Sequence, residues 1–265
     1  KKVGIIGFGG MGKWHAGSIT GNADYCGIKF NESDVVELIG VYDIDPEKAN
    51  KAADNGIHFF STREELLSDE RIDLVTIATP NDVHKEIAID AMRHGKNVIS
   101  EKPVTLCSED LQEMFDASNR TGKLFTVHQN RRWDCDFLAM KQVYESGVLG
   151  EVFNIESRVH GSRGIPGDWR GMKQYGGGMM LDWGVHIIDQ MLLMVPSKIK
   201  KVYCQFDHVT NYEVDDGFRL TLNFENGVRA YLEVGTNNFI NLPRWYMQGE
   251  NGTAIITSVG TCTDK

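Results

Sequence analysis

The sequence predicts two domains: an α/β domain with a doubly wound parallel sheet over residues 1–130, and an α+β domain with a largely antiparallel sheet over residues 131–265. Strand-like and helix-like patterns alternate through the first half, as they do in parallel sheets with helices on both faces. The alternation then stops. Two Asn-Gly pairs, at Asn226 and Asn251, each join two strand-like runs, as hairpin turns do. A length of 265 residues has room for two ordinary domains.

Charge and composition exclude several classes of partner. The chain has 37 acidic and 28 basic residues and a net charge of −9, which disfavours nucleic acid and anionic membrane surfaces. No apolar run approaches the roughly 20 residues that a membrane helix needs. The 5 cysteines are odd in number and include no CxxC pair. We therefore expect a cytoplasmic protein with free thiols.

A glycine-rich turn opens the first domain. The apolar strand Val3–Ile6 runs into this turn, and a helix over residues 11–19 follows. The spacing is GxGxxG in the context that dinucleotide-binding (Rossmann) domains require, because the glycines permit a tight turn and close approach of a pyrophosphate. The predicted cofactor residues of the turn are Gly7, Phe8, Gly9, Gly10, Met11 and Gly12.

The second strand, residues 35–42, ends at Asp43, where a carboxylate is expected to bind the adenosine ribose hydroxyls. The interval from the glycine turn is longer than usual, so we place a loop at residues 21–33. Asp43 and Asp45 would repel a 2′-phosphate, which favours NAD over NADP, although Lys48 is close enough in sequence to reach a phosphate. Asp45 also suits the cap of a helix that begins at Pro46.

Further strand and helix units complete the first sheet. Strands are predicted at 74–78, 97–100 and 124–127. Helices are predicted from a capping box at 61–64, after the turn 79–82, and at 108–119. The fourth strand in this order delivers Glu101-Lys102-Pro103 at its carboxyl end, the edge where open parallel sheets bind ligands. Lys102 is therefore a candidate for a positioned catalytic cation.

The second domain contains a predicted helix at 135–146, a strand at 151–160, a loop at 161–178 and a largely apolar helix that starts near Met180. Asp182, His186 and Asp189 lie at i, i+4 and i+7 on this helix, so they share one polar stripe. The pattern alone suits a proton relay, a metal site or a hydrogen-bonded structural trio. No familiar set of zinc ligands accompanies it, so we expect no metal. Predicted hairpins cover 218–234 and 245–256.

Several motifs together resemble one family. They are VGIIGFGGMG at the N-terminus, Asp43, ATPNDVH at Ala78–His84, EKP at Glu101–Pro103, and GGGMMLDWGVHIID in the second domain. The combination is similar to the Gfo/Idh/MocA family of NAD(P)-dependent oxidoreductases, which act mainly on sugars, cyclitols and their derivatives. The resemblance covers nearly the whole chain. Family members usually exceed 300 residues, so the second domain, expected to serve the substrate and oligomerisation, is expected to be incomplete.

The resemblance implies a catalytic group of Lys102, Asp182 and His186. It also implies a Lys102–Pro103 peptide bond that is often cis. The residues that it places beside the cofactor are Ala78, Thr79, Pro80, Asn81, His84, Glu101 and Lys102.

Chemistry and resemblance together predict hydride transfer from a secondary hydroxyl. An imidazole suits the removal of the hydroxyl proton, so we expect His186 to be the general base, with Asp182 tuning it or binding substrate hydroxyls. Lys102 would stabilise the developing negative charge on oxygen. The loop residues that suit a polyhydroxylated ring are Arg132, Arg163, Trp169, Arg170 and Tyr175.

The residues suit three activities. They are a dehydrogenase, a redox-neutral NAD-dependent lyase or glycosidase, and a non-catalytic dinucleotide sensor. The apolar sheet face of the second domain predicts a homodimer or homotetramer.

Overall fold

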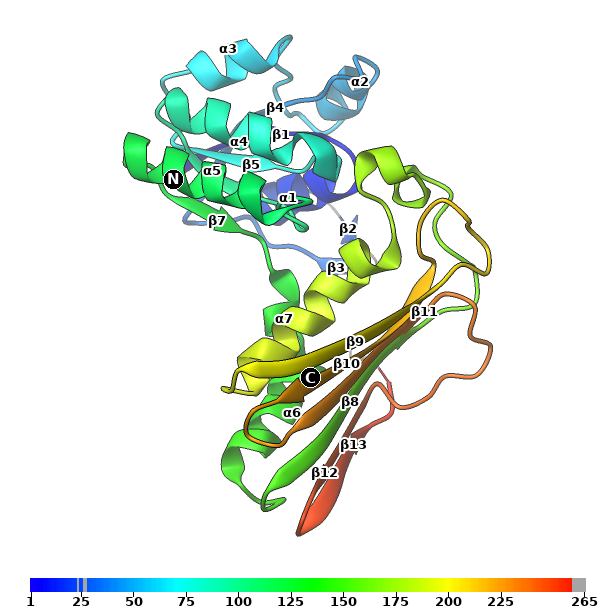
Figure 1. Ribbon diagram of the computed structural model, residues 1–265. Helices are drawn as coiled ribbons and strands as arrows, with labels where there is room; N and C mark the ends of the chain where they lie inside the picture. The colour runs from blue at the N-terminus through cyan, green and yellow to red at the C-terminus, as the bar shows by residue number, and fades with distance from the viewer. Residues whose placement is uncertain (23, 26–27, 259–265) are drawn as a thin grey trace. The chain divides into compact units, whose positions relative to one another are not determined.

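The computed structural model describes residues 1–22, 24–25 and 28–258, which fold into two compact units. The first unit is Lys1–His128 and the second begins at Gln129, close to the boundary predicted after residue 130. Figure 1 traces both units, and each is described here by itself.

A parallel sheet of five strands forms the centre of the first unit, in the order β4-β1-β5-β6-β7. Its strands are β1 (Lys2–Ile6), β4 (Glu37–Tyr42), β5 (Leu74–Ile77), β6 (Asn97–Ser100) and β7 (Phe125–Val127). The helical elements are α1 (Gly10–Thr20), α2 (Lys48–Ala53), α3 (Arg63–Ser68), η1 (Asn81–Val83), α4 (His84–Arg93) and α5 (Ser108–Thr121).

Helices bury apolar side chains against both faces of this sheet. On one face Val3 and Ile5 of β1 pack with Ala16 of α1 and Ala52 of α2. Ile6 belongs instead to the core that α3, α4 and α5 form on the other face. Successive strand residues thus alternate between two cores, because side chains along a strand point to opposite faces. This is the predicted doubly wound α/β arrangement.

Two local predictions in the first unit need correction. The predicted loop at 21–33 contains two short paired strands, β2 (Asp24–Tyr25) and β3 (Ile28–Lys29). The capping box lies one residue later than predicted, because the extended residue before α3 is Thr62. Its hydroxyl accepts a hydrogen bond from the Glu65 backbone N–H (3.0 Å), and the Glu65 carboxylate accepts one from the Ser61 N–H (2.9 Å).

The second unit contains a six-stranded sheet in the order β13-β12-β8-β11-β10-β9. Neighbouring strands pair antiparallel except β8 and β11, which are parallel. Both predicted Asn-Gly hairpins are present, as β10–β11 and β12–β13. The strands are β8 (Val152–His160), β9 (Ile199–Asp207), β10 (Gly217–Phe224), β11 (Arg229–Gly235), β12 (Trp245–Gly249) and β13 (Gly252–Ile256).

Helices α6 (Cys135–Ser146) and α7 (Val185–Met194) supply one side of the core of this unit. Phe137 of α6 and Ile187 of α7 pack with Phe218 and Trp245 of the sheet. The short element η2 (Asn130–Trp133) precedes α6, and the predicted loop at 161–178 contains η3 (Trp169–Gly171) and η4 (Lys173–Tyr175). These elements place the loop residues next to the start of α7.

The first turn of the predicted α-helix at Met180 has a different geometry. Met180–Gly184 (η5) is a π-helical segment, and the α-helix begins only at Val185. A π-turn has more residues than an α-turn, so α-helical periodicity does not apply over the segment that contains Asp182. The prediction of an α-helix at Asp182 is therefore wrong, whereas His186 and Asp189 lie on an α-helix as predicted.

The cysteines and the membrane-spanning potential of the helices were both subjects of prediction. Cys107 and Cys204 are free thiols, as expected, whereas Cys135 is disulfide-bonded, which the wide sequence spacing of the cysteines did not indicate. Within the described part of the chain, no helix has the length and apolar character that crossing a membrane requires.

Candidate active site

The glycine turn after β1 is shaped by two glycines. Gly7 has φ +93°, and a Cβ there would lie 2.6 Å from the Ala78 carbonyl oxygen. At Gly12 a Cβ would lie 1.9 Å from the Gly7 carbonyl oxygen, so α1 can pack this closely only on a glycine. Gly9 and Gly10 face open space. The backbone at the start of α1 is thus left uncovered by side chains, as binding of a pyrophosphate requires.

Asp43 is held at the carboxyl end of β4. Its carboxylate accepts hydrogen bonds from the backbone N–H of Phe8 (2.6 Å) and of Asp45 (2.9 Å). Asp43 thereby ties the second strand to the glycine turn, which places the predicted ribose-binding group next to the predicted phosphate-binding turn.

A cavity of about 290 Å³ opens between these features. Four predicted cofactor residues line it, together with a residue that the sequence did not single out, Arg63. Arg63 is the first residue of α3, and its guanidinium pairs with Glu86 (2.9 Å) and Asp90 (3.5 Å). No motif marks Arg63, because its place at the cavity depends on the packing of α3. The predicted residues at the cavity are Gly7, Asp43, Thr79 and Pro80.

His84 is fully buried between two backbone carbonyls. Its Nδ1 lies 2.9 Å from the Pro103 oxygen and its Nε2 lies 3.0 Å from the Thr79 oxygen. Burial lowers the pKa of this imidazole, although the carbonyl contacts oppose the shift. His84 thus connects the turn after β5 to the segment after β6. That segment contains the Lys102–Pro103 bond, which is cis as the resemblance implied.

Glu101 lies in a polar cluster that the sequence did not predict. Its Oε1 is 2.7 Å from His15 Nε2 and 2.9 Å from His128 Nδ1. Burial acts to raise the pKa of Glu101, but the hydrogen bonds from His128 and His15 lower it to about 2. His15 is on α1 and His128 directly follows β7, so three elements far apart in sequence meet at the carboxyl edge of the sheet. The Trp14 indole packs edge-on against the His15 ring.

Lys102 follows β6 at the same edge. Its backbone N–H donates to Glu101 Oε2 at 3.3 Å. The side chain is half-buried. Lys102 belongs to the first unit, whereas the predicted partners Asp182 and His186 belong to the second, so the predicted catalytic group is divided between the units.

Arg170 contacts two other residues of the predicted catalytic and substrate site within the second unit, Trp169 and Asp182. Its guanidinium lies 4.6 Å from the Trp169 ring centroid and 3.5 Å from the Asp182 carboxylate. Asp168 accepts from Arg170 at 2.7 Å and holds it in place. Trp169, Arg170 and Asp182 therefore form one group, an aromatic face beside a forked donor and a carboxylate.

His186 lies on the first turn of α7 and is 5% exposed. Its ring packs against Trp183 with the ring centroids 5.8 Å apart, and Arg131 stacks over the same tryptophan at 4.3 Å. Tyr175 ends η4, half-buried, and the chain then turns at Gly176.

Arg132 and Asp189 form a separate pair. Arg132 Nε and Nη2 donate to the two carboxylate oxygens of Asp189 at 2.8 and 2.7 Å. The two N–H donors that Arg132 would use to bind a substrate oxygen are therefore already bonded to Asp189. Asp189 is thus a partner of Arg132.

Two glycines before α7 are required by contacts inside the second unit. A Cβ at Gly177 would lie 2.2 Å from the Arg170 carbonyl oxygen, and one at Gly178 would lie 2.3 Å from Asp215 Oδ1. The Asp215 carboxylate accepts from the Met180 N–H at 2.8 Å, and burial raises the pKa of this acid. Gly178 thus makes room for the Asp215 cap of the π-helical turn, and Gly177 makes room for the Arg170 carbonyl.

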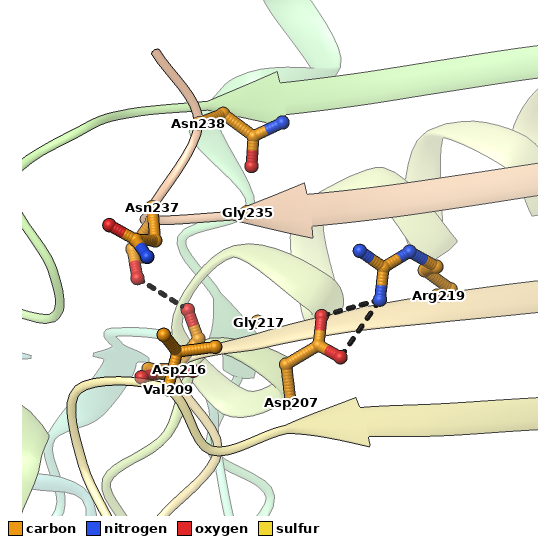
Figure 2. A pocket seen from close by; sticks show the side chains of 9 residues that line it. Asp207, Val209, Asp216, Gly217, Arg219, Gly235, Asn237 and Asn238 are labelled. Atoms are coloured by element: carbon orange, nitrogen blue, oxygen red, sulfur yellow. Dashed lines mark hydrogen bonds and ion pairs between the residues drawn. The ribbon is translucent and has the colours of Figure 1, made fainter.

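Another cavity, of about 140 Å³, lies at the ends of β9, β10 and β11 (Figure 2). Its charged side chains are already paired. Arg219 donates to both oxygens of Asp207, and the Asp216 carboxylate accepts from the Thr210 hydroxyl at 2.8 Å. The polar groups of this cavity thus stabilise the loops between the strands, and we assign no ligand to it.

Comparison with known proteins agrees with this geometry. The family model described as "Oxidoreductase family, NAD-binding Rossmann fold" matches residues 1–129, and the "GFO/IDH/MocA C-terminal domain" model matches residues 137–255. A solved structure of an NAD-binding protein from Listeria innocua is 49% identical, with a TM-score of 0.91 over 97% of this chain and 73% of that chain.

The curated relatives include dehydrogenases with named substrates. The scyllo-inositol 2-dehydrogenase (NADP(+)) IolW of Bacillus subtilis is 32% identical over 72% of this chain and 54% of its own length. The D-glucoside 3-dehydrogenase of Escherichia coli is 27% identical over 75% of this chain and 62% of its own length. The chain spans about half the length of the first curated relatives, 49% of one from Schizosaccharomyces pombe. The two family models together cover the glycine turn, Lys102, Asp182 and His186, and this chain belongs to the GFO/IDH/MocA family of oxidoreductases, with an NAD-binding Rossmann fold in its first unit.

Proposed function

We propose that this protein oxidises a secondary hydroxyl of a cyclitol, sugar or glycoside with NAD. The observation that carries the proposal is the group of Trp169, Arg170 and Asp182 beside the turn that leads to His186. An aromatic face, a forked donor and a carboxylate suit a polyhydroxylated ring, because such a ring has apolar C–H faces and many hydroxyl groups. The two named relatives, which act on an inositol and a glucoside, support this class of substrate.

The residues divide the chemistry among them. His186 takes the hydroxyl proton through a ring nitrogen, and returns it in the reverse direction. Asp182, at the wide turn before it, binds a neighbouring hydroxyl or favours the protonated imidazole. The Lys102 ammonium donates a hydrogen bond to the reacting oxygen and stabilises its negative charge. NAD, when bound, supplies the hydride acceptor.

The choice of NAD over NADP rests on Asp43. Two backbone N–H groups hold its carboxylate at the cavity, and an anion there disfavours a 2′-phosphate. Arg63 at the same cavity is engaged by Glu86 and Asp90, which reduces its attraction for a phosphate. An Asp43→Ser variant should lose preference for NAD. Equal use of both cofactors by the parent protein would contradict this assignment.

A homo-oligomer is part of the proposal. On the sheet of the second unit, Arg158 pairs with Glu233 (3.3 Å), and exposed apolar residues such as Tyr203 and Ile255 lie on strands of the same sheet. We infer that a second copy covers this sheet, as dimer or tetramer. Light scattering of the purified protein measures this directly, and a monomer at micromolar concentration would refute the inference.

The experiment is a screen of inositols, free sugars and methyl glycosides with NAD and NADP, read by absorbance of the reduced nicotinamide. Lys102→Met and His186→Gln should each lower kcat by about 100-fold or more. Lys141→Met, at an exposed ion pair with Glu145, is the matched control and should keep full activity.

The alternatives give different results. Substrate consumption without accumulation of reduced cofactor would indicate a redox-neutral lyase or glycosidase. Full activity in both Lys102→Met and His186→Gln would refute the proposed roles. Cofactor binding without any turnover in the screen would favour a dinucleotide sensor.

A further inference from the structure

The cluster of His15, Glu101 and His128 lies entirely within the first unit. Each residue comes from a different element: α1, the end of β6 and the residue after β7. Tertiary packing alone brings them together, because His15 and Glu101 are 86 positions apart. The oxidoreductase chemistry proposed above assigns no role to the two histidines.

The three residues offer one ligand atom each, and these atoms converge. His15 Nε2, Glu101 Oε1 and His128 Nδ1 all lie within 4.8 Å of one another. In a tetrahedral zinc site, bonds of about 2.0–2.1 Å place the ligand atoms roughly 3.4 Å apart. The hydrogen-bonded contacts to Glu101, at 2.7 and 2.9 Å, are slightly shorter than this spacing. Small side-chain rotations are enough to reach it.

The donor set is one that zinc uses. Two imidazoles and one carboxylate hold the metal in several zinc enzymes and leave a fourth position open. Oxygen-preferring cations such as Mg²⁺ are disfavoured by two nitrogen donors. The set therefore selects a zinc-class cation.

Charge and access both suit a cation. The Glu101 carboxylate is 5% exposed, and its direct partners in the cluster are two imidazoles, which are neutral when they bind a metal. A divalent cation would balance this buried negative charge. The His128 side chain is 25% exposed, compared with 6% for Glu101, so the cluster is open on the histidine side.

Besides those rotations, metal binding requires the histidine protons to lie on the nitrogens that face away from Glu101. His15 Nε2 and His128 Nδ1 now point at the Glu101 oxygen. If each ring carries its proton on the other nitrogen, the same two atoms present lone pairs to a metal. Glu101 Oε2 keeps its contact with the Lys102 N–H.

We propose that His15, Glu101 and His128 form a binding site for Zn²⁺ at the carboxyl edge of the parallel sheet. The site is independent of the proposed substrate and of the residues of the second unit. The structure contains a hydrogen-bonded form of the cluster, and zinc replaces its two hydrogen bonds with coordination bonds.

The test uses the metal-stripped protein and Zn²⁺ alone, by titration calorimetry and thermal melting. A Cys107→Ser background removes the exposed free thiol as a competing ligand. We expect one Zn²⁺ per chain and a raised Tm, because the metal binds the folded form. Mg²⁺ should have no effect.

Variants separate coordination from hydrogen bonding. Glu101→Gln and His128→Leu should weaken zinc binding at least about 100-fold, more than loss of an outer-shell partner. His128→Asn keeps a side-chain N–H near Glu101 but removes the imidazole, so it should melt like the parent without zinc and lose zinc binding. His94→Gln is the matched control, since His94 also contacts carboxylates, Glu64 at 3.2 Å and Asp90 at 3.5 Å.

The outcomes are distinct. Saturable binding lost in His128→Asn and kept in His94→Gln supports the site. No saturable binding, or binding that persists in His128→Asn or disappears in His94→Gln, overturns it.

Discussion

Replacement of Asp136 by alanine should destabilise the second unit strongly. Asp136 lies on α6 and is 4% exposed, and its Oδ2 is 3.1 Å from Arg244 Nε. The same oxygen accepts from the Trp245 indole N–H at 3.1 Å. Arg244 is equally buried, and burial lowers the pKa of its guanidinium. The variant would leave this cation in the interior without its only charged hydrogen-bond partner among the described residues.

The magnitude follows from those contacts. Breaking a buried ion pair on one side costs about 3–5 kcal/mol, because the remaining charge stays desolvated. Loss of the indole hydrogen bond adds on the order of 1 kcal/mol. In the variant, Arg244 retains its hydrogen bonds to Ser157 and to Gln190 (3.1 Å) and its stacking on the Trp245 ring. These contacts keep the total loss in the free energy of unfolding near the lower end of the range, at about 3–4 kcal/mol.

Urea unfolding followed by tryptophan fluorescence measures this change, and circular dichroism at the same urea concentrations tests whether both units unfold together. The double variant Asp136→Leu with Arg244→Met should recover most of the loss, since it removes both charges. Glu145→Ala, at the exposed pair with Lys141, should cost less than about 0.5 kcal/mol. A loss below about 1 kcal/mol in Asp136→Ala would refute the reasoning.

Three further predictions concern the first unit. Gly12→Ala should weaken NAD binding at least tenfold by equilibrium dialysis, because a Cβ there meets the Gly7 carbonyl, and unchanged binding would contradict this role of Gly12. Burial lowers the pKa of His84, so below about pH 6.5 its imidazole is protonated in the unfolded chain but remains neutral in the folded one. The free energy of unfolding should therefore fall as the pH drops below about 6.5. His84→Asn should flatten that slope between about pH 7 and 5 in urea melts, and an unchanged slope would contradict the assignment. Thr62→Ala should cost about 1 kcal/mol through loss of the α3 cap, and a change in Tm indistinguishable from zero would count against it.

The sequence was sufficient for features that depend on neighbouring residues. The glycine turn, Asp43 at the end of β4, and Lys102 at the end of β6 were all located in advance. A strand that leads into GxGxxG leaves few alternatives for the chain, since Gly7 has a positive φ and a Cβ at Gly12 would collide with the Gly7 carbonyl. The Asn-Gly hairpins of the second unit were predicted for the same kind of reason.

Periodicity was less reliable at the start of α7. The spacing of Asp182, His186 and Asp189 predicted one α-helical stripe, but the first turn is π-helical. The cause is tertiary: Asp215, from a loop before β10, accepts from the N–H of Met180, and Gly178 leaves room for that carboxylate. Local spacing contains no information about a capping group 35 positions away.

By itself the sequence determined the fold class of each unit and the residues of the glycine turn, because periodicity and glycine conformations are local properties. Only the tertiary structure decided which polar side chains meet. It paired Arg132 with Asp189 and Arg170 with Asp182, and it placed Glu101 between two histidines. Such contacts join distant positions, and the free energy that selects them comes from burying charged groups with partners, which no local pattern encodes.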